Sequence, residues 1–253
     1  MSVKSKKYFL SIVIPCFNES KGLKKLFLKI KKSAENYQNI EFIIVENGSG
    51  DNSRSTLINY EKKFNIDNIK FVYIDKNIGY GNGIKKGLYY ASPNSEYIGW
   101  THGDSQTDIL DVEKAYKILK KNKSSGNLCI KGKRIKRPFR KKILSLGMEI
   151  LFSIILRHKL HEITSQPVFI KFNQLNKLEL PNGLEMDLYL YYMCIKNDCK
   201  IFRLNTTQNE RKHGTGRWCG RSDGRYGQTD IRGQHSVANT AKNQSVSLSF
   251  AAS

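Results

Sequence analysis

The sequence predicts an α/β protein in which a mostly parallel sheet carries helices on both of its faces. Short apolar runs, rich in β-branched residues, alternate with helical segments four times between residues 9 and 122. The connections between these segments are short, as in strand–helix–strand units. Such units close through right-handed crossovers, so their strands lie parallel. The loops that follow the four strands therefore gather at one edge of the sheet.

The first two strand–helix units are the most regular. Residues 9–15, FLSIVIP, form a β-branched run that a proline closes. After Ser20, apolar residues recur at the i, i+3, i+4 and i+7 positions of an amphipathic helix. Residues 40–45, IEFIIV, predict the second strand, and a turn-rich loop, ENGSGDNS, separates it from a weaker helix through Phe64.

The next two units lead to the polar cluster after the fourth strand. The third strand is predicted at residues 70–74, and the helix after it stops before Pro93. The fourth strand ends at Trp100, and the helix after it carries apolar residues through Leu119. Between these two elements, Asp108 is predicted to cap the helix.

After Asn122 the pattern is less regular, but it still predicts one domain over residues 1–220. From about Arg221 the composition shifts to Ser, Gln, Asn, Gly and Thr, so residues 221–253 are predicted to be a disordered or non-native tail. The elements expected in this half are strands at 128–132, 166–171 and 200–204 and helices at 143–160 and 184–195.

The charge predicts an anionic partner. The 253 residues include 43 Lys and Arg against 22 Asp and Glu, a net charge of +21, which suits nucleic acid, anionic lipid or a phosphorylated substrate. Residues 131–142 hold eight basic residues and no acid. The helix that follows is apolar almost all round, so it is expected to be buried or to lie at an interface. Its apolar stretch is shorter than the roughly 20 residues that span a bilayer.

Polar side chains follow the first, second and fourth strands, where an open α/β sheet binds its ligands. The glycines at positions 79, 81, 83 and 87 match neither the dinucleotide motif nor the phosphate loop. His102, Asp104 and Gln106 instead offer oxygen and nitrogen donors for a divalent cation.

Four segments together resemble the family 2 glycosyltransferases of the GT-A fold, and most closely their polyprenyl-phosphate sugar synthase branch. These segments are IVIPCFNES, VENGSGDNS, NIGYGNGIKKGL and WTHGDSQTD, in the family's order and spacing. Further on, Gly132-Lys133-Arg134 is similar to the family's G-S-R. The segment from Arg211 to Arg217 is similar to its R-x-x-G-x-S-K, with Gly216 in the serine position. The resemblance covers roughly residues 8–218.

The resemblance implies how the site is divided. Residues 1–122 would form the half that binds the nucleotide sugar, and residues 123–220 the acceptor side. A divalent cation, Mg²⁺ or Mn²⁺, would be held by Asp104, with Gln106 and His102 beside it. The nucleotide-binding residues implied are Pro15, Asn18, Glu19, Glu46, Asn47, Ser49 and Gly81.

Two of these assignments stay open between alternatives. His102 stands where the family usually has an acid. It would either ligate the metal, favouring Mn²⁺, or bind a diphosphate oxygen or the backbone. Gly81 and its neighbouring glycines would either let the nucleotide approach or supply turn geometry.

The catalytic assignments are Asp104, Asp187 and Arg211. Asp187 would act as a general base, with Glu185 as a rival, or would only favour the start of its helix. A lipid phosphate acceptor is already an anionic nucleophile and needs no base. Arg134 and Arg211 would then hold its phosphate.

The function that this resemblance implies is inverting transfer from a UDP- or GDP-sugar to a polyprenyl phosphate or a surface glycan. The apolar run near the N-terminus resembles a first strand more than a signal peptide, so the chain is expected in the cytoplasm. Its basic run is expected to hold it at the inner face of an anionic membrane. Nucleic acid is not the expected partner, because the aromatic residues do not interleave with the basic run. Two alternatives stay open, a basic nucleic-acid-binding module and a degenerate glycosyltransferase that binds nucleotide without turnover.

Overall fold

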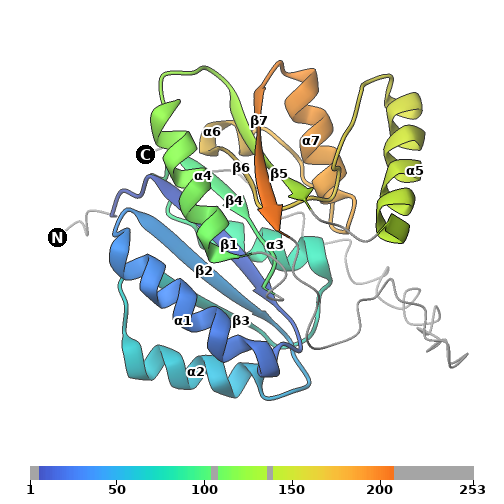
Figure 1. The fold of residues 1–253 in the computed structure, drawn as a ribbon. Helices are drawn as coiled ribbons and strands as arrows, with labels where there is room; N and C mark the ends of the chain where they lie inside the picture. The colour runs from blue at the N-terminus through green and yellow to red at the C-terminus, as the bar shows by residue number, and fades with distance from the viewer. Residues whose placement is uncertain (1–5, 104–107, 136–138, 208–253) are drawn as a thin grey trace, which may run out of the picture. The chain divides into compact units, whose positions relative to one another are not determined.

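A computed structural model describes residues 6–103, 108–135 and 139–207 of the chain. Within these residues a sheet of seven strands runs in the order β3-β2-β1-β4-β6-β5-β7 (Figure 1). The strands are β1 Leu10–Cys16, β2 Ile40–Asn47, β3 Ile69–Ile74, β4 Tyr97–Trp100, β5 Leu128–Ile135, β6 Val168–Lys171 and β7 Lys200–Thr207.

The predicted mostly parallel sheet is confirmed. Strand β1 pairs in parallel with β2 and β4, and β2 pairs in parallel with β3. The register places Cys16 of β1 opposite Glu46 of β2, so the two strands reach the same edge together. Strand β6 is antiparallel to both β4 and β5, whereas β5 is parallel to β7.

Helices cover both faces of the sheet, as predicted. One core cluster packs β1 and β2 against α1, α2 and α4, and a second packs the opposite face against α3, α6 and α7. Neighbouring residues of β1 alternate between them, with Ile12 in the first cluster and Val13 in the second, as the two-residue period of a strand requires. The helices are α1 Ser20–Asn36, α2 Ser53–Phe64, α3 Tyr80–Tyr89, α4 Ile109–Lys121, α5 Phe139–Leu156, α6 Phe172–Leu175 and α7 Met186–Lys196.

Helix α5 is not a crossover helix on the sheet. Its residues Met148, Phe152 and Leu156 pack against a small third cluster of Leu160, Ile163 and Tyr191. The connection from β5 to β6 therefore does not wind back over the sheet, and β6 enters antiparallel. Among the described residues, no helix is both long and apolar enough to cross a membrane.

Several predicted bounds were wrong around the basic run. Strand β5 extends beyond 132 to Ile135, because residues 132–135 pair with residues 204–207 of β7. Helix α5 begins at Phe139 rather than at 143, since Lys and Arg are themselves good helix formers. It ends at Leu156 rather than at 160, because Arg157 adopts the left-handed conformation with φ 53°.

The chain divides into two units, Met1–Gly214 and Thr215–Ser253. The predicted tail, residues 221–253, lies outside the described residues. So do Asp104, Gln106 and Arg211. The predicted cap of α4 is confirmed, because the side chain of Asp108 accepts a hydrogen bond from the backbone N–H of Leu110.

Candidate functional site

The loops after β1 and β2 are joined at the edge of the sheet. The backbone N–H of Asn18 donates to Ser49 Oγ at 3.0 Å, and the N–H of Gly50 donates back to Asn18 Oδ1 at 2.8 Å. Asn18 adopts a left-handed conformation with φ 55°, which asparagine tolerates better than most residues. The structure thus brings Asn18 and Ser49, which lie 31 positions apart, into one turn.

A second set of contacts fixes the start of α1 against the start of α2. The N–H of Glu19 donates to Ser53 Oγ at 3.0 Å. Asp51 accepts from the backbone of Ser20 at 3.0 Å and of Ser53 at 2.9 Å. Partial burial raises the pKa of Asp51, but the hydrogen bonds from Ser53 and Ser20 outweigh it and hold the pKa below its ordinary value. Asp51 is therefore a negative charge that organises both helix starts.

Glu46 lies fully buried at the end of β2. Its Oε1 accepts from the backbone N–H of Ser49 at 2.6 Å. Its Oε2 accepts no hydrogen bond from the described residues, and Arg54 Nη1 lies 4.0 Å from it. Arg54 also donates to Asp75 at 2.9 Å. The site therefore retains one unused carboxylate oxygen beside a guanidinium group.

The side chain of Asn47 is hydrogen-bonded to the loop that follows β3. Its Nδ2 donates to the carbonyl of Gly79 at 3.0 Å and to Asn77 Oδ1 at 3.3 Å, and its Oδ1 accepts from the backbone of Ile78 at 3.3 Å. The side chain is 4% exposed, which leaves it little room for a ligand. Both ends of this amide therefore hold protein backbone or side chain in the described structure.

Gly81 allows a close approach, but to another part of the protein. A Cβ atom at Gly81 would lie 2.5 Å from the carbonyl carbon of Asn182. The N–H of Asn82 donates to the carbonyl of Asn182 at 3.1 Å, and Lys85 Nζ donates to the side chain of Asn182 at 2.6 Å. Gly81 thus serves the packing of α3 against the segment before α7.

The loop after β4 lies against the end of β1. A Cβ atom at Gly103 would come within 2.2 Å of the carbonyl oxygen of Pro15, so the two backbones touch there. His102 is half-buried beside this contact and makes no hydrogen bond or ion pair with the described residues. Within the described ranges, no three His, Cys, Asp or Glu side chains are placed to hold a metal ion. Asp104 and Gln106 belong to residues that the structure does not describe.

Asp187 lies in a buried network with Trp100, the last residue of β4, and Tyr80, the first residue of α3. Its Oδ1 accepts from Trp100 Nε1 at 2.9 Å, and its Oδ2 accepts from Tyr80 Oη at 3.1 Å and from Gln166 Nε2 at 3.3 Å. Gln166 Nε2 also contacts Tyr80 Oη. Burial, followed by the charge of Asp187, raises the pKa of Tyr80 well above its ordinary value. Glu185 is exposed by contrast, and its Oε1 accepts from the backbone of Gly183 at 3.0 Å.

Arg134 lies near the end of β5 and is already paired. Its Nε donates to Glu162 Oε2 at 2.7 Å, and its Nη2 donates to Thr164 Oγ1 at 3.3 Å. Neighbouring Lys131 is fully buried, with Nζ 5.3 Å from the ring centroid of Tyr191. Burial lowers the pKa of Lys131, although the charge of Asp187 opposes the shift. Arg134 and Lys131 are thus held by protein partners, and Arg211 is outside the described residues.

The structure brings part of the predicted set together. Pro15, Asn18, Glu19, Glu46, Asn47 and Ser49 lie along the edge formed by the ends of β1 and β2. Asp187 is joined instead to the end of β4 and the start of α3, and Arg134 is paired with Glu162. Three further residues were not predicted. Arg54 could have been noticed in the sequence, because a cation in the first turn of a helix is unfavourable with the helix dipole and suggests a functional role. Tyr80 and Gln166 could not, since only the fold brings them to Asp187.

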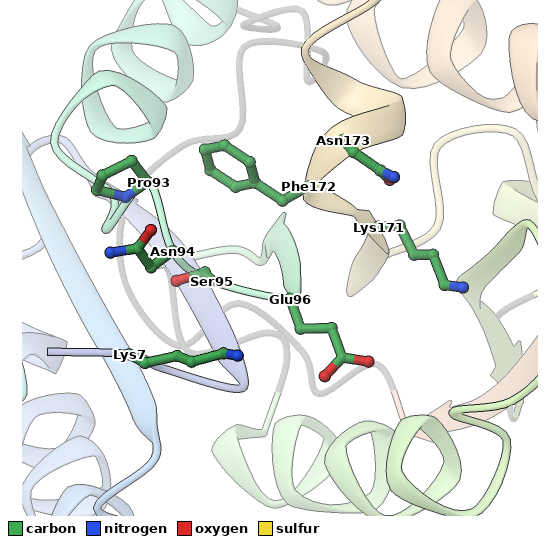
Figure 2. Close-up of a pocket in the computed structure, with 8 residues that line it drawn as sticks. All are labelled: Lys7, Pro93, Asn94, Ser95, Glu96, Lys171, Phe172 and Asn173. Atoms are coloured by element: carbon green, nitrogen blue, oxygen red, sulfur yellow. The ribbon is translucent and has the colours of Figure 1, made fainter. Parts of the chain in front are cut away.

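A cavity of about 780 Å³ lies at the opposite edge of the sheet. It is lined by residues 93–96, which precede β4, and by residues 171–173 at the end of β6, with Lys7 beside them (Figure 2). The pairing of Tyr97 with Lys171 places these segments together at the start of β4. The cavity is therefore separate from the loops that follow β1 and β2.

Comparison with solved structures supports the fold. Glucosyl-3-phosphoglycerate synthase from Mycobacterium tuberculosis, in complex with Mn²⁺, UDP and glucosyl-3-phosphoglycerate, superposes with a TM-score of 0.62 at 15% sequence identity. The match covers 82% of this chain and 73% of that chain. The same enzyme in complex with Mn²⁺, UDP and phosphoglyceric acid gives a TM-score of 0.61 at 16% identity, over 81% of this chain and 72% of the other. The likeness confirms the GT-A fold that was predicted.

Comparison of sequences identifies the family. A dolichyl-phosphate beta-glucosyltransferase of Trichomonas vaginalis is 29% identical over 155 residues, which are 56% of this chain and 47% of that protein. The dolichyl-phosphate beta-glucosyltransferase of Homo sapiens is 30% identical over 116 residues, or 44% of this chain and 35% of that protein. The chain thus spans less than half the length of these relatives. Residues 11–176, more than half of the chain, match the profile of Glycosyl transferase family 2. The chain therefore belongs to glycosyl transferase family 2, as its motifs predicted.

Proposed function

We propose that the chain transfers a sugar from a nucleotide-diphosphate sugar to a lipid phosphate. One observation carries the proposal. In a member of glycosyl transferase family 2, the loops after β1 and β2 are joined into one edge by hydrogen bonds of Asn18 with Ser49 and Gly50. A preformed edge of this kind binds a ligand without a large ordering cost. The sequence relatives carry the name dolichyl-phosphate beta-glucosyltransferase, which makes glucose the first sugar to test.

The nucleotide would bind along this edge, in the half that comprises residues 1–122. Glu46 would accept from the base or the ribose, as the resemblance implies. Its Oε2 accepts no hydrogen bond from the described residues, but it is buried beside Arg54, so a nucleotide would have to displace part of this cover. Asn18 and Ser49 are already bonded to each other, so they would shape the pocket through their backbone. Asn47 and Gly81 would act indirectly, by holding the loops on either side.

A divalent cation would be held by Asp104 and Gln106, with His102 as a further donor. Carboxylate, amide and imidazole donors fit Mn²⁺ or Mg²⁺, and His102 is half-buried with no partner among the described side chains. When bound, the cation would neutralise the charge that builds on the leaving diphosphate. Arg54 would add positive charge near the same edge, because its Nη1 lies 4.0 Å from Glu46.

The acceptor would be a polyprenyl phosphate or a surface glycan, bound by residues 123–220. A lipid phosphate is the better match to this chain, since its oxygen is an anionic nucleophile and requires no base. Asp187 is buried, and both of its oxygens accept hydrogen bonds. We therefore propose that Asp187 positions its neighbours, as an alternative to the predicted role as a general base. Arg134 and Arg211 would bind the acceptor phosphate. An acceptor of this class is a membrane lipid, so the enzyme would act at a membrane surface, and we propose the cytoplasmic, inner face.

Donor binding is tested by a thermal-shift series of nucleotide diphosphates with Mn²⁺ or Mg²⁺. A ligand at 100 times its Kd stabilises the folded state by about 2.7 kcal/mol, which is a readily measured shift. UDP or GDP should raise the Tm, and Glu46→Gln should weaken the effect. Steep, salt-dependent binding of nucleic acid without any nucleotide shift would instead favour a nucleic-acid-binding module.

Transfer is tested with UDP-glucose and a short polyprenyl phosphate. Asp104→Ala and the addition of EDTA should each abolish glucolipid formation while the folded state persists. Full turnover in EDTA would contradict the metal role. Donor binding without transfer to any acceptor would identify a degenerate enzyme, and failure of both binding and transfer would contradict the proposal as a whole.

A further inference from the structure

Helix α5 presents an outward apolar face that no other described element covers. The helix stands at the side of the fold, next to α7 (Figure 1). The most exposed of its large apolar residues are Leu144, 77% exposed, and Ile154, 71% exposed. The face comprises seven residues that are each more than half exposed: Ile143, Leu144, Leu146, Ile150, Leu151, Ile154 and Ile155.

This face differs from ordinary exposed apolar residues. Elsewhere in the described chain such residues are scattered over several elements, for example Leu28 on α1 and Leu110 on α4. Soluble monomers rarely gather so many large apolar side chains on one helix face. The inward side of α5 already packs, through Met148 and Phe152, against the third core cluster. The apolar side chains of the outward face therefore do not contribute to the described core.

The acidic residue of α5 is already held by partners within the protein. Glu149 is the only acid between residues 139 and 156. Its Oε1 accepts from the backbone N–H of Glu162 at 2.9 Å, and its Oε2 lies 3.6 Å from His161 Nδ1. The Glu149 side chain is 12% exposed and is held by these partners, although it lines a groove with Leu146, Ile150 and Ile154. None of the seven residues of the outward face is acidic.

Cationic side chains stand at both ends of the outward face. Lys142 is exposed in the first part of the helix, and Arg157 and Lys159 are exposed just beyond its end. At 1.5 Å per residue, the 18 residues of α5 extend over about 27 Å. A second copy of the chain, packed in either direction, would bring these cations together. A surface of lipid phosphates would pair with all of them.

We propose that the outward face of α5 lies in the headgroup region of an anionic bilayer, parallel to its surface. Leu144 and Ile154 would enter the acyl boundary, and Lys142, Arg157 and Lys159 would contact lipid phosphates. This inference goes beyond the proposed transfer reaction. It requires neither a nucleotide sugar nor a specific acceptor, so it stands or fails separately.

Flotation of the full chain with vesicles tests the proposal. Vesicles of phosphatidylcholine and phosphatidylglycerol in equal amounts should carry the protein, and pure phosphatidylcholine should carry much less. The double variant Leu151→Ser/Ile154→Ser should lower the partition coefficient roughly tenfold or more. The matched control is Leu28→Ser/Leu110→Ser, which removes two leucines of similar exposure, 48% and 55%, from α1 and α4. It should bind as the unmodified chain does.

A second measurement keeps the side chain apolar and reports its surroundings. The fluorescence of Ile154→Trp should shift to the blue on anionic vesicles and be quenched by brominated lipid, whereas that of Leu110→Trp should not change. Equal loss of flotation in both double variants, or no flotation of the unmodified chain, would overturn the proposal. So would sedimentation equilibrium that shows a dimer dissociated by Leu151→Ser/Ile154→Ser, because the face would then belong to a second copy.

Discussion

Replacing Asp187 with alanine removes the acceptor of three buried side-chain donors. Trp100 Nε1, Tyr80 Oη and Gln166 Nε2 all donate to this carboxylate, at 2.9, 3.1 and 3.3 Å. The carboxylate also faces the buried ammonium group of Lys131, whose pKa it raises against the larger effect of burial. The substitution thus leaves three donors, from β4, α3 and the loop before β6, without their shared partner.

The cost follows from these contacts. A buried donor without an acceptor costs about 1–3 kcal/mol, and losses at neighbouring groups are not additive. We therefore expect Asp187→Ala to lower the free energy of unfolding by about 3–5 kcal/mol. Asp187→Asn keeps one acceptor oxygen but turns an amide N–H₂ toward donors, so it should cost about 2 kcal/mol.

The assay is urea unfolding followed by tryptophan fluorescence, combined with transfer kinetics on the folded fraction. Asp187→Asn should retain kcat to within about tenfold and change mainly the KM for donor or acceptor, as a positioning residue does. Glu185→Gln, two residues away and exposed, is the matched control and should shift stability by less than about 0.5 kcal/mol.

One result would refute this reasoning. If Asp187→Asn has unchanged stability but loses kcat by about a hundredfold or more, the carboxylate is a general base, which is one of the roles that the sequence left open. A glycan hydroxyl would then be the more suitable acceptor, because it needs deprotonation. If Glu185→Gln alone loses kcat, the rival assignment holds.

Three further predictions concern the rest of the site. Since the folded pKa of Asp51 lies below its ordinary value of 3.8, its stabilisation should be present above about pH 4 and be lost as pH falls further. Urea midpoints of Asp51→Asn and the unmodified chain should therefore converge in acid. Gly81→Ala should cost about 1–3 kcal/mol because its Cβ meets Asn182 backbone, whereas Gly147→Ala, in open space on α5, should be neutral or stabilising in thermal unfolding. Arg134→Gln should cost about 3 kcal/mol in urea unfolding by leaving Glu162 unpaired, and Glu162→Gln should restore part of it.

The four strand–helix units before residue 122 could be predicted from the sequence, because the apolar pattern of each segment agrees with the way it packs in the fold. Strands β1, β2 and β4 are mostly apolar and almost wholly buried, as expected where helices cover both faces of a strand, and β3 at the edge of the sheet is only partly buried. The antiparallel entry of β6 could not be predicted, since it depends on α5 packing beside the sheet instead of across it. The pattern of α5 was compatible with burial or with an interface. The structure shows that its inward side packs and its outward side does not.

The contacts of the candidate site could be predicted at the ends of the parallel strands β1 and β2, but not in the other loops. The meeting of Asn18 and Ser49 follows from the parallel register of β1 and β2. The use of Asn47 and Gly81 to hold neighbouring loops does not, because the same Asn and Gly residues suit a turn or a ligand equally well. The contact between Trp100 and Asp187 joins residues 87 positions apart, and no local pattern indicates it.

That contact links the two parts of the proposed reaction. Trp100 is the last residue of β4, two positions before His102 and four before Asp104, so its indole is close along the chain to the predicted metal ligands. Asp187 begins α7, which packs on the same core cluster as α3. A shift of α7 would therefore move the start of the loop that carries Asp104. For this reason we expect Asp187→Asn to weaken the Mn²⁺-dependent thermal shift given by UDP, although Asp187 lies outside the proposed nucleotide pocket. An unchanged shift would mean that the acceptor side and the donor side bind independently.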